Sequence, residues 1–207
     1  MNSAPISQTL RSLVRSLPRT GITLSELIQR VGNDGLLILV TLLTLVFLIP
    51  VSIPGVSTVF GAAILLISVS RLFGRNLWIP AKIEHRIIGT RKLRPLLRKA
   101  LSWLKKLERV SRPNRIEWLV TGGTMAVINN LALILGAVLL MMPFGLIPFS
   151  NTFPAVAILF LAIGLLQRDG LCILLGHVSN VVTILYFAVL IGGGGLAIRE
   201  VFNRFAG

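Results

Sequence analysis

Residues 49–58 read IPVSIPGVST and divide a run of 36 residues, from Gly35 to Ser70, that contains no charged side chain. Pro50, Pro54 and Gly55 cannot continue a helix without releasing backbone groups from their hydrogen bonds. About 14 apolar residues precede the break and about 13 follow it, and a full membrane span needs roughly 20. The pattern therefore predicts a broken hairpin. Its tip is either a turn at the far membrane surface or a re-entrant loop within the membrane.

A second uncharged run, the 50 residues from Trp118 to Gln167, contains a similar break, which reads MPFGLIPFSNTFP at residues 142–154. Shifting the chain by 94 residues aligns seven identical residues among the 20 positions from Ile53 to Leu72, including Pro54 with Pro148 and Thr58 with Thr152. Apolar composition does not explain the matched proline and threonine, so the pattern predicts an internal duplication. Interrupted segments at corresponding positions of two halves are typical of a transporter-like binding site.

The composition indicates a membrane protein. Apolar residues make up 54% of the chain and the mean hydropathy is +0.85, which is too high for a water-facing surface. A third uncharged run covers 29 residues, from Gly170 to Ile198. We therefore expect an all-α, polytopic helical membrane protein with two proline-broken hairpins related by an internal repeat, a final span that ends at Gly192–Gly195, and a basic interfacial helix.

The charge is concentrated in one connecting segment. Of the net +14, the stretch from Arg71 to Arg115 carries 14 Lys or Arg against two Glu, a net +12, and the positive-inside rule places it in the cytoplasm. Leucines at helical spacing after Pro95 predict an amphipathic helix at the membrane surface. Its basic residues are expected to contact anionic lipid headgroups, at roughly 1 kcal/mol each. They are Arg98, Lys99, Lys105, Lys106 and Arg109. A specific site for a lipid phosphate or anionic sugar is the alternative, and nucleic acid is disfavoured because few aromatic residues interleave the charges.

These features divide the chain into five segments. They are a cytoplasmic N-terminal segment (1–34), the first hairpin (35–72), the basic connector (73–117), the second hairpin (118–167), and a final membrane helix with a short tail (168–207). No cleavable secretory signal is evident, so insertion is expected to begin at the first apolar run. The charge after the last run is too small to fix the side of the C-terminus, and the oligomeric state, including a homo-oligomer, stays open.

Short polar side chains follow each break: Ser57 and Thr58 in the first half, and Ser150, Asn151 and Thr152 in the second. These residue types are good helix N-caps, and the start of a half-helix offers N–H groups and a positive dipole end to an anion such as phosphate. They either cap the helix alone or also contact a ligand.

Other polar residues lie in or beside the apolar runs. Arg168, Asp169 and Gly170 fit a tight interfacial turn, with a functional pair in a polar cavity as the alternative. For Asn129, Asn130, His177 and Asn180 we expect hydrogen bonds between helices, although His177 is also suited to relay protons. The candidate substrate-binding residues are Pro54, Gly55, Ser57, Thr58, Asn151, Thr152, Arg168 and Asp169.

The sequence offers little support for an enzyme. Its seven acidic residues are scattered, so no carboxylate pair suggests acid–base catalysis. His85 and His177 lie in unrelated segments without metal-ligand spacing, and the lone Cys172 cannot form an intrachain disulfide. A nucleophile elbow and a phosphate-binding glycine loop are also missing from the sequence. We expect no catalytic residues, no metal and no cofactor.

The motifs resemble those of the ExoD family of bacterial exopolysaccharide-synthesis proteins over nearly the whole chain. They are Ile49-Pro50, Ile53 to Thr58 with Phe60-Gly61, Trp103 to Arg109, Asn151 to Ala155, and Arg168-Asp169-Gly170. The chain departs from the pattern at Gln167, where an acidic residue is expected. The resemblance implies an integral inner-membrane protein that supports or modulates exopolysaccharide production, and it supplies no catalytic residues.

Three functions are compatible with these patterns. In the first, a transporter or lipid-handling protein binds a polyprenyl phosphate or lipid-linked sugar between the hairpin tips. In the second, a non-transporting scaffold or regulatory subunit docks partners through the basic connector. In the third, a proton or cation pathway uses Arg168, Asp169 and His177.

Overall fold

The structure is a computed structural model that describes residues 11, 15, 22–48, 55–73, 87–88, 101–102, 115–144 and 147–206. Its helices in this part of the chain are α2 (Leu24–Leu45), α3 (Val56–Leu72), α6 (Gly123–Leu140), α7 (Thr152–Gln167) and α8 (Gly170–Ala206). Two short 3-10 helices, η1 (Val46–Leu48) and η2 (Glu117–Leu119), extend α2 and precede α6. The predicted helical fold class is confirmed for these residues.

Three details differ from the sequence prediction. A short antiparallel ladder pairs β1 (Ile22–Thr23) with β2 (Ile87–Ile88). Helix α2 begins at Leu24, ahead of the apolar run that starts at Gly35. The expected end of the last helix at Gly192–Gly195 is wrong, because α8 continues to Ala206. Glycine lowers helix propensity by only about 1 kcal/mol per residue, so a helix can continue through several glycines. The predicted interfacial helix lies outside the described residues, apart from the helical positions 101 and 102.

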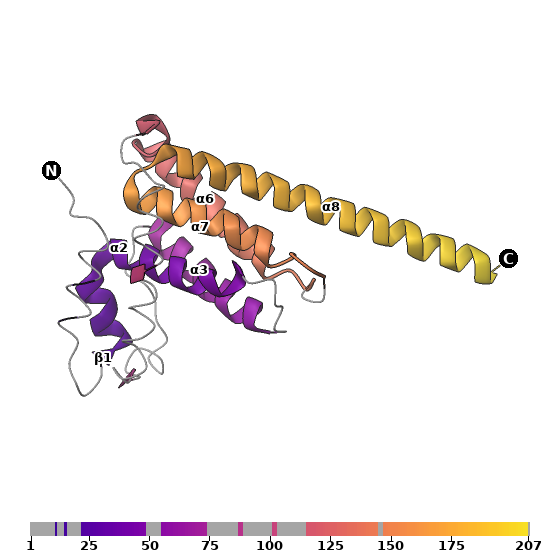
Figure 1. The fold of residues 1–207 in the computed structure, drawn as a ribbon, viewed down its shortest axis with the longest axis horizontal. Coiled ribbons are helices and arrows are strands. Elements are labelled where there is room, and N and C mark those ends of the chain that lie inside the picture. The colour runs from indigo at the N-terminus through magenta and orange to yellow at the C-terminus, as the bar shows by residue number, and fades with distance from the viewer. Residues whose placement is uncertain are drawn as a thin grey trace.

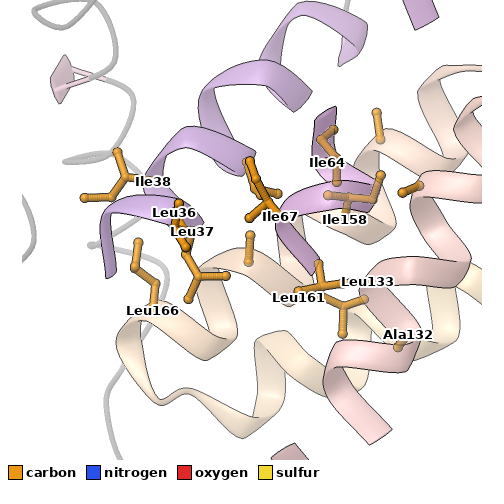
Figure 2. Close-up of a cluster of buried hydrophobic side chains, with 14 of the residues drawn as sticks. Leu36, Leu37, Ile38, Ile64, Ile67, Ala132, Leu133, Ile158, Leu161 and Leu166 are labelled. Atoms are coloured by element: carbon orange, nitrogen blue, oxygen red, sulfur yellow. The ribbon is translucent and has the colours of Figure 1, made fainter. Parts of the chain in front are cut away.

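The four hairpin arms pack crosswise. Helix α2 packs chiefly against α7, and α3 chiefly against α6, so each first arm contacts the second arm of the other hairpin. Figure 2 shows the apolar core where these helices meet, with Leu37, Ile64, Leu133, Ile158 and Leu161 fully buried. Helix α8 lies along α7 and runs well past the other helices toward the C-terminus (Figure 1). If α2 is exchanged with α6 and α3 with α7, the same two helix contacts result, as a duplication requires. The duplication itself stays a prediction.

The surface of the helices is apolar and several polar groups are inside. Valine and leucine side chains cover the outside of α6 and α8, including Leu131 and Val181, and Val189 is 72% exposed. Buried polar side chains include Thr44, Ser68, Asn129, Asn180 and Thr183. The hydroxyls of Thr44 and Ser68 donate to the carbonyl four residues earlier in the same helix. Large exposed apolar surfaces indicate contact with lipid or another protein, and polar residues turned inward are typical of membrane helices.

Helix length supports the same interpretation for part of the chain. Two apolar helical segments, Gly123–Leu140 and Gly170–Gly194, are long enough to cross a membrane. The other three apolar helical segments are shorter, covering Gly35–Leu48, Ser57–Leu72 and Thr152–Gln167.

Glycines let α7 and α8 approach each other closely. A Cβ atom on Gly164 would lie 2.8 Å from the backbone nitrogen of Ile173 and 3.0 Å from the carbonyl oxygen of Asp169. A Cβ atom on Gly176 would lie 3.0 Å from the backbone nitrogen of Leu161. Small residues at such crossings allow van der Waals contact between helix backbones, which stabilises helix pairs in a membrane.

We predict that Gly164→Ala destabilises the fold, because backbone atoms of α8 occupy the position of the new methyl group. The expected loss is roughly 1–3 kcal/mol of unfolding free energy, measured by denaturation in detergent micelles. Gly193→Ala is the matched control, since no described atom lies within 4 Å of its Cβ position. Equal stability of the two variants would contradict the close α7–α8 packing.

Candidate functional site

The two hairpin tips lie at the same end of the bundle. Gly61, in the second turn of α3, packs against the Met141 side chain, and its Cβ position is 3.3 Å from the carbonyl oxygen of Ala137. Met141 follows the last residue of α6 and opens the second break. Gly55 and the first turn of α3 follow the first break, so the described residues beside the two breaks lie at this end. Pro54 and the five basic candidates of the connector lie outside the described residues.

Corresponding residues at the two tips both have a positive φ. Gly55 has φ +84° and Phe149, 94 positions later, has φ +64°. The carbonyl of Gly55 accepts a hydrogen bond from the N–H of Val59 at 3.2 Å, and the carbonyl of Phe149 accepts one from Phe153 at 3.1 Å. A left-handed conformation is unfavourable for phenylalanine, so the surroundings must hold it in place. This match supports the predicted correspondence of the two halves.

The prediction that polar side chains cap α3 and α7 is wrong for the described residues. The N-cap positions are Gly55 and Asn151, and neither makes a side-chain cap hydrogen bond. At α7 the carbonyl of Phe149 accepts the N–H groups of Thr152 and Phe153, and Pro154 has no N–H. The backbone thus already satisfies the donors that an anion would need there.

Other polar residues of the tips mostly face inward. The Ser150 hydroxyl lies 2.8 Å from the carbonyl oxygens of both Phe144 and Ile147, which closes the second turn. Ser57 and Asn151 are buried, and Thr152 is half-buried. Thr58 is exposed on the first turn of α3. Of the predicted polar tip residues, only Thr58 therefore presents an exposed side chain.

The exposed surface of the tips is largely apolar. Val59 is 66% exposed, Phe149 is 51% exposed and Met142 is 38% exposed. An aromatic cluster, which includes Phe149, joins the second tip to α8. Its members are Phe144, Phe149, Phe153, Tyr186 and Phe187. The Tyr186 hydroxyl donates a 2.7 Å hydrogen bond to the carbonyl of Pro148. We call the surface formed by Thr58, Val59, Met142 and Phe149 the tip surface.

The Arg168 and Asp169 pair lies at the opposite end of α7. The 16 residues of α7 separate it from the tips by about 24 Å. Arg168 ends α7 with φ +53°, and Asp169 Oδ1 accepts the N–H of Leu171 at 3.0 Å at the start of α8. Gly170 donates its N–H to the carbonyl of Arg115 at 2.8 Å, and the Arg115 and Ile116 backbone occupies the space of a Cβ. All three residues have the geometry of the predicted turn, and the candidate residues do not form one site.

We predict that Asp169→Ala lowers the free energy of unfolding by about 1 kcal/mol, because α8 loses its N-terminal acceptor. Asp169→Asn should keep most of this stability, since asparagine caps helices as well as aspartate does. Denaturation in detergent measures both variants. If Asp169→Asn unfolds as easily as Asp169→Ala, the negative charge rather than the hydrogen bond is required.

A network of hydrogen bonds joins α6 to α8 in the middle of the bundle. Asn129 Nδ2 donates to the carbonyl of Leu119 at 2.8 Å, so Asn129 Oδ1 faces His177 Nε2 at 2.9 Å. Because this oxygen can only accept, Nε2 carries the proton and Nδ1 is the acceptor in neutral His177. Asn180 Nδ2 donates to the carbonyl of Ala132 at 2.9 Å. These contacts agree with the predicted interhelical role of the three residues, whereas Asn130 donates to Ala126 of its own helix.

A double-mutant cycle tests the contact between Asn129 and His177. With Asn129→Leu, His177→Leu and the double variant, we expect a coupling energy of about 0.5–2 kcal/mol in favour of the native pair. Unfolding in detergent provides the free energies. Additive effects of the two substitutions would mean that the hydrogen bond does not stabilise the helix pair.

Sequence reasoning missed several residues that shape the two ends of α7. The roles of the Phe149 carbonyl, the Tyr186 hydroxyl and the Arg115 carbonyl depend on contacts between distant segments, which no local pattern reveals. Of these residues, only Phe149 could have been found from the sequence, because the offset of 94 residues aligns it with Gly55, which follows the first break.

Comparison with known proteins gives consistent results. The family described as "Exopolysaccharide synthesis, ExoD" matches residues 6–189. Protein ExoD of Rhizobium meliloti (strain 1021) is 51% identical over 185 residues, which cover 89% of this chain and 77% of the relative. An uncharacterized protein of Synechocystis sp. is 30% identical over 170 residues, which cover 80% and 78% of the two chains. No solved structure matches.

Proposed function

The chain belongs to the ExoD family of exopolysaccharide-synthesis proteins, and from this membership we propose that it is a multi-pass inner-membrane protein that binds a lipid-linked intermediate at its hairpin tips. The proposed ligand is a polyprenyl phosphate or a sugar linked to such a lipid. The protein binds or moves this ligand without catalysing a covalent step.

The observation that carries this proposal is the position of the two tips. The contact of Gly61 with Met141 brings both breaks to one end of the bundle, away from Arg115 and Arg168. Interrupted helices that meet in this way are where many membrane transporters bind their substrates.

The tip surface suggests how the ligand is held. Val59, Met142 and Phe149 expose apolar area that suits an isoprenoid chain. The phosphate belongs beside the exposed Thr58 on α3 rather than at α7, because the Phe149 carbonyl already accepts the first N–H groups of α7. This assignment narrows the predicted site to the α3 side of the tips.

We predict that the protein binds polyprenyl phosphate in detergent micelles, and that replacing Ser57, Thr58, Asn151 and Thr152 together by Ala weakens binding. Thr58→Ala alone should account for most of the loss, since a hydrogen bond to a charged group contributes about 1.5–3 kcal/mol. Ligand-dependent quenching of intrinsic fluorescence or native mass spectrometry measures the affinity.

Ser179→Ala is the matched control, because its hydroxyl bonds within α8 to the carbonyl of Leu175. The control should bind like the wild type. Unchanged binding by the fourfold variant would remove the tips as the binding site. The scaffold function, in which the +12 connector docks partners, would then be the better proposal.

A further inference from the structure

Helix α8 shows how deep the second tip lies. The hydrogen bond from the Tyr186 hydroxyl to the Pro148 carbonyl fixes the tip beside residue 186. Ring contacts between Phe153 and Tyr186 at 4.9 Å, and between Phe144 and Phe187 at 5.1 Å, hold it at the same level. The other end of α8 is anchored at Gly170 by the Arg115 carbonyl. The distance from Gly170 to Tyr186 along α8 therefore gives the level of the second tip relative to the turn at Gly170.

This distance is less than the hydrocarbon thickness of a bilayer. Sixteen helical steps separate Gly170 from Tyr186, about 24 Å, whereas the hydrocarbon core is about 30 Å thick. The apolar segment of α8 continues about 12 Å beyond the tip, to Gly194, and its first charged residue, Arg199, lies about 20 Å beyond. Figure 1 shows this part of α8 standing clear of the other helices. Helix α8 thus extends well beyond the level of the second tip.

The first tip lies at a similar level. Gly61 contacts Met141 beside the second break, and Gly55 precedes it by six residues on the tip side of α3. The described residues of both tips therefore lie at one end of the bundle, and among the described helices α8 continues past them.

We infer that the tip surface of Thr58, Val59, Met142 and Phe149 lies inside the hydrocarbon, in the leaflet opposite the basic connector, and that this leaflet is thinner over the tip surface than beside α8. The inference rests on the proposed membrane placement, but it does not depend on the ligand. The occupants of the space above the tips are the acyl chains of phospholipids. Helices that are too short for a bilayer are known to thin it locally.

The chemistry of the tip surface favours acyl chains over water. Val59, Met142 and Phe149 would expose apolar area to solvent if the tips were loops at the membrane surface. The residues from Trp118 to Gln167 contain no charge that would hold the second tip at the headgroups. A second copy of the chain is the competing occupant, and the test below distinguishes it.

A thinned leaflet would bring lipid headgroups closer to the proposed binding site. The headgroups of neighbouring lipids would lie closer to the tips than to the outer end of α8. A lipid with a phosphate or sugar headgroup could then reach Thr58 while its chain stays in hydrocarbon. The partner that this surface fits is therefore a lipid with a large polar headgroup, approaching from the leaflet opposite the connector.

Cysteine labelling tests the depth of the tips. In a Cys172→Ala background, single cysteines are placed at Val59 and Met142 on the tip surface and at Gly207 at the C-terminus. A membrane-impermeant maleimide applied to cells with a permeable outer membrane should label Gly207→Cys and leave Val59→Cys and Met142→Cys unlabelled. Labelling of the tips as complete as that of Gly207→Cys would overturn the inference, as would a failure of Gly207→Cys to react.

Spin labels on the same cysteines identify the occupant in liposomes. For Val59→Cys and Met142→Cys, oxygen dissolved in hydrocarbon should relax the nitroxide strongly and a water-soluble nickel chelate weakly. Val189→Cys, which is exposed on α8 beyond the tip, is the control for lipid contact. Disulfide cross-linking between two copies through Val59→Cys would overturn the assignment to acyl chains. None of these measurements uses a lipid-linked sugar, so their failure and a failure of ligand binding are separate results.

Discussion

Backbone N–H and C=O groups inside a bilayer must find partners within the protein, because hydrocarbon offers none. A helix meets this requirement through its own hydrogen bonds. The two proline-containing breaks between the helices do not, because proline interrupts the helical hydrogen bonds. At the second break, the Phe149 carbonyl accepts two N–H groups of α7, the Ser150 hydroxyl lies within hydrogen-bond distance of two turn carbonyls, and Tyr186 donates to Pro148. The left-handed φ of Phe149 is the local cost of this arrangement. These contacts give the described polar groups of the second break partners within the protein.

The same requirement explains the interior of the bundle. Hydroxyls such as those of Thr44 and Ser68 are satisfied within their own helices, whereas the amides of Asn129 and Asn180 reach carbonyl oxygens in or beside α6. Hydrocarbon provides no hydrophobic drive for helices to associate. Close contact at Gly164 and Gly176 and the hydrogen bonds of His177 and Asn180 therefore hold α8 to the bundle.

The sequence was sufficient for the helical class, the positions of both breaks and the turn at Arg168-Asp169-Gly170, because prolines, glycines and uncharged runs act locally. It was not sufficient for the capping of α7. Serine and asparagine are good caps in general, but here the carbonyl of Phe149 reaches the same N–H groups first. The contact of Gly170 with Arg115 joins two segments 55 positions apart, and the Tyr186 hydrogen bond spans 38 positions. Such contacts depend on how the helices pack, which local patterns do not specify.

The two hairpins are alike in ways that side-chain identity does not explain. Exchanging the halves turns the α2–α7 contact into the α3–α6 contact, and Gly55 and Phe149 both have a positive φ. Because the described residues of both tips lie at one end of the bundle, the two halves run in the same direction, as in parallel rather than inverted repeats. Helix α8 has no counterpart in the first half of the described chain, so it breaks this relation. It covers the second tip through Tyr186 and Phe187, while Thr58 and Val59 of the first tip stay exposed. A ligand at the tips would therefore meet the first hairpin before the second.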